Sequence, residues 1–106
     1  RGATSRDFLW AGDVYIQAGR LEEARAAFGT AVAREPDLYL GWLALGDVYL
    51  SLGRPLDAKA AWTRAARLCA TADVLMRLAR EALASRDHPR GVDLLQQALD
   101  APGGDG

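Results

Sequence analysis

The side chains best suited to catalysis or metal binding are scarce in this chain. Cys69 is its only cysteine and His88 its only histidine. A zinc site needs several ligands and a disulfide needs two thiols, so one chain can build neither a zinc cluster nor a disulfide framework. We expect Cys69 to be a packed, inert thiol. His88 stands before Pro89, which suits the first turn of a helix, so we expect a turn residue there.

Other arrangements that support catalysis are missing from the sequence as well. It contains no Gly-rich phosphate loop, and no pair of carboxylates or nucleophile with a base stands out. We therefore predict no catalytic residue, no cofactor and no metal ligand. The protein is not expected to be an enzyme.

Composition and charge exclude two further classes of function. Half of the 106 residues are hydrophobic, a quarter are charged, and the formal net charge is -1. This is the composition of a folded globular chain. Nucleic-acid binding usually requires a basic stripe, and a membrane span requires a long apolar run. We predict neither a nucleic-acid partner nor membrane insertion.

The two ends of the chain suggest a piece of a longer protein. The sequence begins at Arg1 without an initiator methionine and ends in a Gly-rich segment, 102–106. A targeting segment would then have been removed, so the compartment is unknown and the cytoplasm is only the default expectation. Lys59 is the only lysine among many arginines, which hints at a GC-rich, bacterial source.

The strongest feature of the sequence is an internal repeat. LWAGDVYIQAGR, residues 9–20, returns as LALGDVYLSLGR, residues 43–54, at an offset of 34. A more divergent third copy follows at an offset of 33. Self-similarity at such a period is typical of repeat architectures. The identical pairs include Leu9 and Leu43, Gly12 and Gly46, Asp13 and Asp47, Tyr15 and Tyr49, Gly19 and Gly53, and Arg20 and Arg54.

Each copy has the pattern of a helical hairpin. In the first, apolar residues recur at steps of three and four, as on one face of a helix. Gly19 then supplies the left-handed residue that ends a helix, and Glu22 and Glu23 favour the start of the next. Small residues such as Gly12 stand where large ones such as Phe28 must pack. One hairpin cannot bury its apolar face alone, so the hairpins must stack.

These residues resemble the tetratricopeptide repeat, a helix-turn-helix of thirty-four residues. Its signature is matched by Phe8, Ala11-Gly12, Tyr15, Ala24, Phe28, Ala31 and Pro36, and again by Trp42, Leu45-Gly46, Tyr49, Ala58, Trp62 and Ala65. The resemblance implies an all-α, right-handed α-solenoid of three hairpins and six helices. We expect a leader at 1–4, repeats at 5–38, 39–71 and 72–101, the third degenerate, and a flexible tail at 102–106.

The resemblance also implies a function and a site. Members of the family are scaffolds and adaptors, and they bind an extended peptide or a helix of a protein partner in a concave groove lined by the first helix of each hairpin. By register with the family, the groove positions are Arg6, Leu9, Trp10, Asp13 and Gln17, then Leu40, Leu43, Ala44, Asp47 and Ser51, then Asp73, Met76, Arg77, Arg80 and Ala84.

One known type of groove is not expected. Chaperone-binding members hold a peptide's terminal carboxylate with a clamp of Lys, Asn and Arg. The corresponding positions here are Leu9, Asp13, Ala44, Asp73 and Arg77, of which only Arg77 matches. We predict a ligand with a basic or polar N-terminal part, Leu-like or aromatic anchors and a few acids, and no binding of chaperone tails.

Trp10 allows two interpretations. It lies about 200° around the helix from Phe8, which fills the Trp position of the repeat. Tryptophan is common among the residues that dominate interfaces, so Trp10 is a candidate ligand anchor at the groove edge. Alternatively, it packs against the segment from Arg1 to Ser5.

A second function remains open beside partner binding. No further polar helix is expected after Ala101, so the last helix would leave part of its apolar face uncovered. Homo-oligomerisation through that face is the alternative to peptide binding, with Leu94, Leu95 and Leu99 as the candidate residues.

Overall fold

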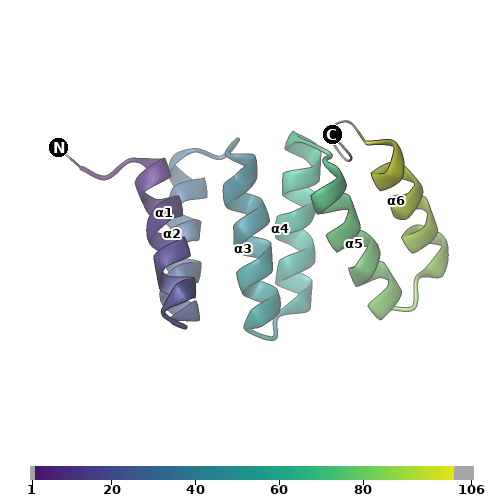
Figure 1. The fold of residues 1–106 in the computed structure, drawn as a ribbon, viewed down its shortest axis with the longest axis horizontal. Helices are drawn as coiled ribbons and strands as arrows, with labels where there is room; N and C mark the ends of the chain where they lie inside the picture. The colour runs from purple at the N-terminus through teal and green to yellow at the C-terminus, as the bar shows by residue number, and fades with distance from the viewer. Residues whose placement is uncertain (1, 102–106) are drawn as a thin grey trace.

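The chain folds into helices throughout the part that the structure describes. The computed structural model describes residues 2–101, and the predicted tail, 102–106, lies outside it. The predicted all-helical solenoid with six helices is confirmed within this range, where no strand occurs (Figure 1). The helices are α1 (Ser5–Gln17), α2 (Leu21–Arg34), α3 (Tyr39–Ser51), α4 (Pro55–Leu68), α5 (Ala72–Ala84) and α6 (His88–Asp100).

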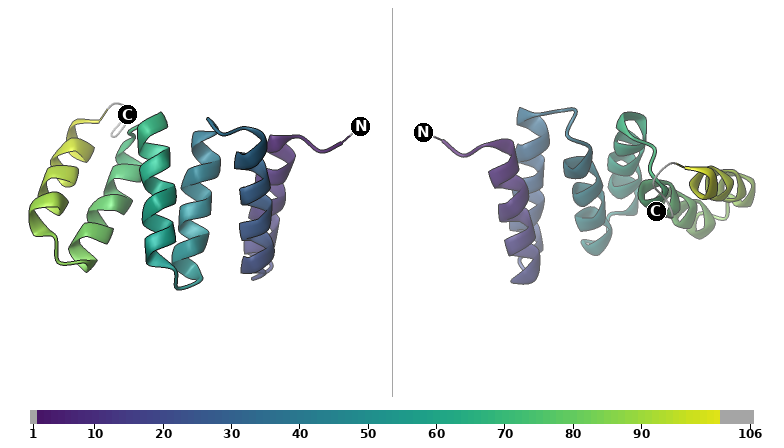
Figure 2. Two further views of the ribbon diagram at one scale, coloured as in Figure 1. Left: turned by 180° about the vertical axis from the view of Figure 1, so that it is seen from behind. Right: turned by 45° about the horizontal axis from the view of Figure 1, so that its top comes forward.

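The six helices form one elongated row of three hairpins. The principal contacts join consecutive helices, and the molecule measures 47 × 28 × 22 Å. The first helices of the hairpins, α1, α3 and α5, begin at the first residues of the three predicted repeats. α1 and α3 lie nearer the viewer in Figure 1, with α2 and α4 behind them. The right-hand view of Figure 2 shows that the third hairpin is turned relative to the first.

Local signals define the ends of the helices. Thr4 and Asp7 form a capping box at the start of α1, with bonds of 2.8 and 3.2 Å between each backbone N–H and the other side chain. Gly19 and Gly53, with φ of 77° and 76°, end the first two hairpins' leading helices in the left-handed conformation. Arg86 takes the same conformation in the third hairpin, with φ of 66°.

The core alternates small and large residues, as the sequence pattern predicts. Phe28 is 1% exposed, and a Cβ added to Gly12 would lie 2.4 Å from its ring. Trp62 and Gly46 repeat this contact in the second hairpin, also at 2.4 Å. In the third hairpin the position of Gly12 and Gly46 is held by Ala79, and Leu95 takes the place of the aromatic ring. The small residues therefore allow the helices of the first two hairpins to approach around an aromatic ring.

Cys69 departs from its prediction. The sequence predicts a packed thiol, but Cys69 is exposed. It follows the last residue of α4 in an extended conformation, with φ of -159° and ψ of 106°. The chain therefore leaves the helix before this side chain can reach the core.

Candidate binding groove

The predicted groove residues all lie on α1, α3 and α5, one helix of each hairpin. Two hollows form between these helices, and together they collect most of the predicted residues. We name them the first hollow, between α1 and α3, and the second hollow, between α3 and α5.

The first hollow is small and mainly apolar. Its volume is about 250 Å³. Its lining combines two carboxylates with aliphatic residues from α1 and α3, and the ring of Phe28 from α2. The lining residues are Leu9, Asp13, Phe28, Leu40, Leu43, Ala44 and Asp47.

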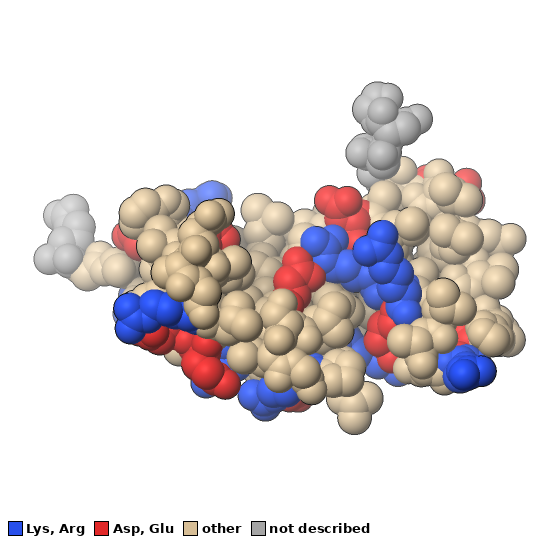
Figure 3. Space-filling model, turned by 60° about the horizontal axis from the view of Figure 1, so that its bottom comes forward, with Lys and Arg blue, Asp and Glu red and all other residues tan. Residues whose placement is uncertain are grey.

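The second hollow is larger and carries more charge. Its volume is about 680 Å³, and residues of α3, α4 and α5 surround it. Figure 3 shows basic and acidic side chains gathered together toward the α5–α6 end of the molecule, a largely uncharged stretch in the middle, and further charged side chains toward α1. The lining residues are Asp47, Leu50, Ser51, Pro55, Trp62, Asp73, Met76, Arg77, Arg80, Glu81 and Ala84.

An ion pair joins the two sides of the second hollow. Arg77 of α5 donates from Nε and Nη2 to the two carboxylate oxygens of Asp47 on α3, at 2.7 and 3.0 Å. Trp62 donates from Nε1 to the same carboxylate at 3.1 Å. The hydrogen bond to Asp47 raises the pKa of Arg77 above its ordinary value, so the guanidinium stays charged throughout the physiological range.

This ion pair changes the predicted charge pattern of the groove. Arg77, the one residue that matches the chaperone clamp, is bonded to Asp47 and is not a free donor for a carboxylate ligand. Asp47 likewise no longer acts as an isolated acid. Asp13 and Asp73 remain as the exposed acids of the groove positions. Both residues are predicted groove positions, but the sequence does not predict their contact, for which the only signal is their place on successive first helices.

Arg80 is the basic residue of the second hollow that stays available. Within residues 2–101 it makes no ion pair, and its side chain is exposed. Glu81 beside it is engaged by Arg90, whose Nη1 donates to Oε1 at 3.0 Å. The hollow therefore presents one uncommitted cation next to apolar side chains.

Three predicted groove residues line neither hollow: Arg6, Trp10 and Gln17. All three are exposed, and Trp10 is 71% exposed. The described part of the segment from Arg1 to Ser5, residues 2–5, therefore does not bury Trp10, and the interpretation in which Trp10 packs there is wrong. Leu50 is a lining residue that the sequence analysis missed. It is 53% exposed and lies on the groove side of α3, one residue before Ser51.

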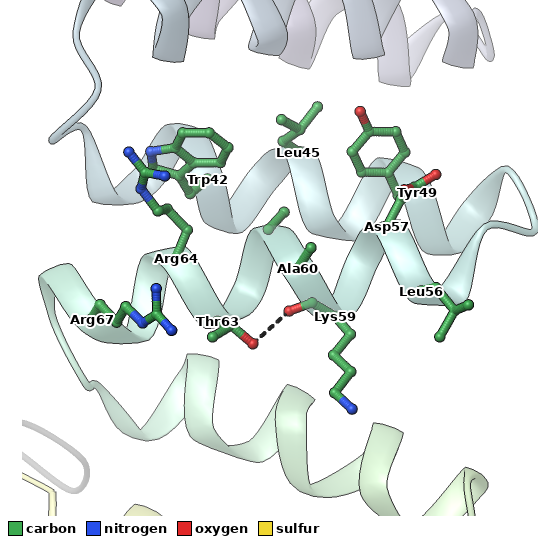
Figure 4. Close-up of a pocket in the computed structure, with 11 residues that line it drawn as sticks. Trp42, Leu45, Tyr49, Leu56, Asp57, Lys59, Ala60, Thr63, Arg64 and Arg67 are labelled. Carbon is green, nitrogen blue, oxygen red and sulfur yellow. Dashed lines mark hydrogen bonds between the residues drawn. The ribbon is translucent and has the colours of Figure 1, made fainter.

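A further hollow lies between α3 and α4 (Figure 4). Its volume is about 580 Å³, and Arg64 lies over the ring of Trp42 there, 5.0 Å from guanidinium carbon to ring centroid. A smaller version, of about 260 Å³, occurs at the matching positions of the first hairpin, such as Phe8 and Thr30. Because both hairpins produce it, we attribute this hollow to the packing of a hairpin's own helices.

The residues predicted for self-association separate into two groups. Leu94 is 9% exposed and belongs to the core around Trp62, so its assignment to an uncovered face is wrong. It points into the hairpin because it faces α5. Leu95 and Leu99, at 39% and 74%, are exposed.

Sites of other kinds are not found in the described chain. No three His, Cys, Asp or Glu side chains of residues 2–101 come together as metal ligands would. No helix in that range has the length and apolar character needed to cross a membrane.

Comparisons with known proteins agree with this architecture. A family model described as tetratricopeptide repeat matches residues 10–73, more than half of the chain. No match is found among curated protein sequences. The crystal structure of MamA superposes with a TM-score of 0.88 at 16% identity, covering 92% of this chain and 57% of that one. The APC/C hetero-tetramer Cut9–Hcn1 gives 0.86 at 21% identity, covering 94% and 19%. The chain thus spans less than two thirds of either relative.

Proposed function

The chain belongs to the tetratricopeptide repeat family, and on that premise we propose that it binds a segment of a partner protein in the groove of α1, α3 and α5. Repeats of this family generally mediate protein–protein interaction and scaffolding, and their fold is typically non-catalytic. The observation that carries the proposal is the pair of hollows between the first helices, about 250 and 680 Å³ in volume. An extended peptide or a helix lying across α1, α3 and α5 would place side chains in both.

The second hollow defines the chemistry of the ligand. Leu50 and Met76 are 53% and 36% exposed, and their apolar side chains suit a Leu-like or aromatic anchor. Arg80 would pair with an acid beside that anchor. Asp13, in the first hollow, would favour a basic or polar residue at the other end of the ligand. The ligand is thus of mixed charge with one central apolar anchor.

The clamp chemistry of chaperone-binding relatives does not belong to this proposal. Arg77 is held by Asp47, and a terminal carboxylate in the groove would also approach Asp73. Binding of a peptide should therefore not depend on a free C-terminus.

The test is a selection of short peptides from a random display library on the purified chain, followed by titration of the selected peptides. Leu50→Glu would place a charge in the second hollow without touching the core, and we expect it to weaken binding roughly tenfold, about 1.4 kcal/mol. Leu56→Glu is the matched control, because Leu56 is 78% exposed on α4 and lines no part of the two groove hollows.

Two results would contradict the proposal. One is a selection that yields no shared motif. The other is equal loss of affinity in Leu50→Glu and Leu56→Glu, which would place the ligand elsewhere. Amidation of the peptide's C-terminus should leave the affinity unchanged. A large loss of affinity on amidation would show that the groove binds a terminal carboxylate after all.

A further inference from the structure

The α5–α6 end of the row presents exposed apolar side chains. Leu83, Val92 and Leu99 are 60%, 54% and 74% exposed. Leu83 and Val92 line a hollow of about 280 Å³ together with Arg80 and Leu95. We name these four residues and Leu99 the tail face. Exposed apolar residues gathered around one charge are typical of an interaction surface.

One tail-face position, that of Leu95, is covered in the two preceding hairpins. Leu95 of the tail face is 39% exposed, whereas its counterparts Trp62 and Phe28 are 3% and 1% exposed. α5 packs on the second hairpin and α3 on the first. In each case the covering element is thus the first helix of the next hairpin. The tail face therefore corresponds to the surface on which the first helix of the next hairpin packs elsewhere in the row.

The opposite end of the row exposes a helix face of the complementary kind. Trp10 and Val14 of α1 are 71% and 44% exposed, and we name them the head face. Val48, the counterpart of Val14 in α3, is 1% exposed. In α5 the counterparts are Arg77 and Glu81, whose side chains are 32% and 9% exposed. The face with which α3 and α5 pack on the preceding hairpin is thus exposed on α1.

We propose that the head face of one copy of this chain docks on the tail face of a second copy, so that α1 takes the place there that α5 takes on the second hairpin. The occupant of the tail face is then a second copy of this same chain. This surface is distinct from the proposed peptide groove, apart from Arg80, which lines both.

The first complementary pair replaces the ion pair between hairpins. Within the chain, Arg77 of α5 bonds to Asp47 of the second hairpin. The corresponding residues at the junction of two copies are Trp10 and Arg80. A guanidinium over an indole ring is attractive, and the chain already stacks an arginine of α4 over a tryptophan ring of α3 at 5.0 Å. The exposed Trp10 therefore gains a partner.

The second complementary pair is apolar. Inside the chain, Lys59 of α4 faces Glu81 of α5 at 4.0 Å. The corresponding residues at the junction are Val92 of the tail face and Val14 of the head face. Two exposed valines would be removed from water there, whereas a charge at either position would face an apolar partner.

Such a contact joins two different surfaces, so it does not close on itself. A heterologous contact of this type extends into longer chains of copies unless its rotation closes a ring. We expect the mean mass of the protein in solution to rise continuously with concentration, beyond that of a dimer.

The test is light scattering behind size exclusion on the whole chain over a concentration series, with far-UV circular dichroism to confirm folding. Val14→Asp and Val92→Asp should each stay monomeric, because the new carboxylate would face an apolar partner. Both variants should fold, since both residues are exposed and neither is needed for the core. An equimolar mixture of the two variants should form a dimer and nothing larger, because one intact head meets one intact tail. Leu56→Asp is the control and should associate like the unchanged chain.

Three outcomes would overturn the proposal. A chain that stays monomeric at every concentration shows that the two faces do not bind each other. Loss of association in Val92→Asp but not in Val14→Asp indicates a symmetric contact between two tail faces. Equal loss in Leu56→Asp places the contact elsewhere. Because Leu50→Glu leaves both faces intact, peptide binding and self-association can fail independently.

Discussion

Single glycines decide how closely the helices of a hairpin approach. Gly46 faces Trp62, and a Cβ at that position would lie 2.4 Å from two atoms of the indole. Trp62 is buried and its N–H is bonded to Asp47, so the ring has little freedom to move. Gly29, in α2, has nothing within 4 Å of its Cβ position. The same residue type thus has opposite roles at two helical positions.

Gly46→Ala should destabilise the protein, and Gly29→Ala should stabilise it. Overpacking against the buried indole is expected to lower the free energy of unfolding by about 1–3 kcal/mol. Alanine at the open position gains helix propensity, up to about 1 kcal/mol. Urea unfolding followed by circular dichroism measures both. Equal effects of the two substitutions would show that the contact with Trp62 is not what requires glycine.

At the scale of the elements, the three hairpins share one turn but not its residue. In the second hairpin the N–H of Gly53 donates to the carbonyl of Leu50 at 3.0 Å. In the third, Arg86 donates to Leu83 at the same distance, with φ of 66°. The left-handed conformation costs a side-chain-bearing residue about 1–2 kcal/mol. The third turn therefore keeps the geometry of the second at a cost in stability.

Arg86→Gly should raise the free energy of unfolding by about 1 kcal/mol, because glycine adopts this conformation without strain. Gly53→Ala is the matched reverse and should lower it by a similar amount. The measurement is the midpoint of urea unfolding at unchanged slope. A midpoint of Arg86→Gly at or below that of the unchanged chain would contradict the expected relief of strain.

At the scale of the whole molecule, stability depends on how the hairpins are joined. Contacts link neighbours along the row, so each junction contributes separately. The junction of the second and third hairpins has the ion pair of Arg77 with Asp47, in which the side chains are 32% and 42% exposed. The first junction has no such pair, since Ala44 holds the position of Arg77 there.

Arg77→Met should lower the free energy of unfolding by less than about 1 kcal/mol, because an ion pair this exposed contributes little and methionine keeps the apolar stem of the side chain. Asp47→Ala should cost about 2 kcal/mol, since it also leaves the buried N–H of Trp62 without its acceptor. Unfolding of the two single variants and the double variant measures the coupling. Equal costs for the two single variants would contradict the role given to Trp62.

Local pattern sufficed for the architecture. The spacing of Gly12, Phe28 and their counterparts predicts paired helices, because small and large residues must alternate where helices meet. The type and place of Gly19 predict a left-handed residue at the end of the first helix, and Gly53 is its counterpart in the repeat. By contrast, the exposure of Cys69 and the burial of Leu94 depend on where the chain leaves one helix and which neighbour the next one faces.

The sequence alone therefore determined the repeat and its six helices, since these follow from periodicity along the chain, and its signature residues identified the family. The groove positions came from register with that family and stay a prediction. Only the tertiary structure decided which groove charges are free. Asp47 and Arg77 are 30 residues apart and meet because α5 packs beside α3, which turns two predicted ligand contacts into an internal ion pair. Contacts between repeats depend on how the hairpins turn relative to one another, and no single repeat encodes that.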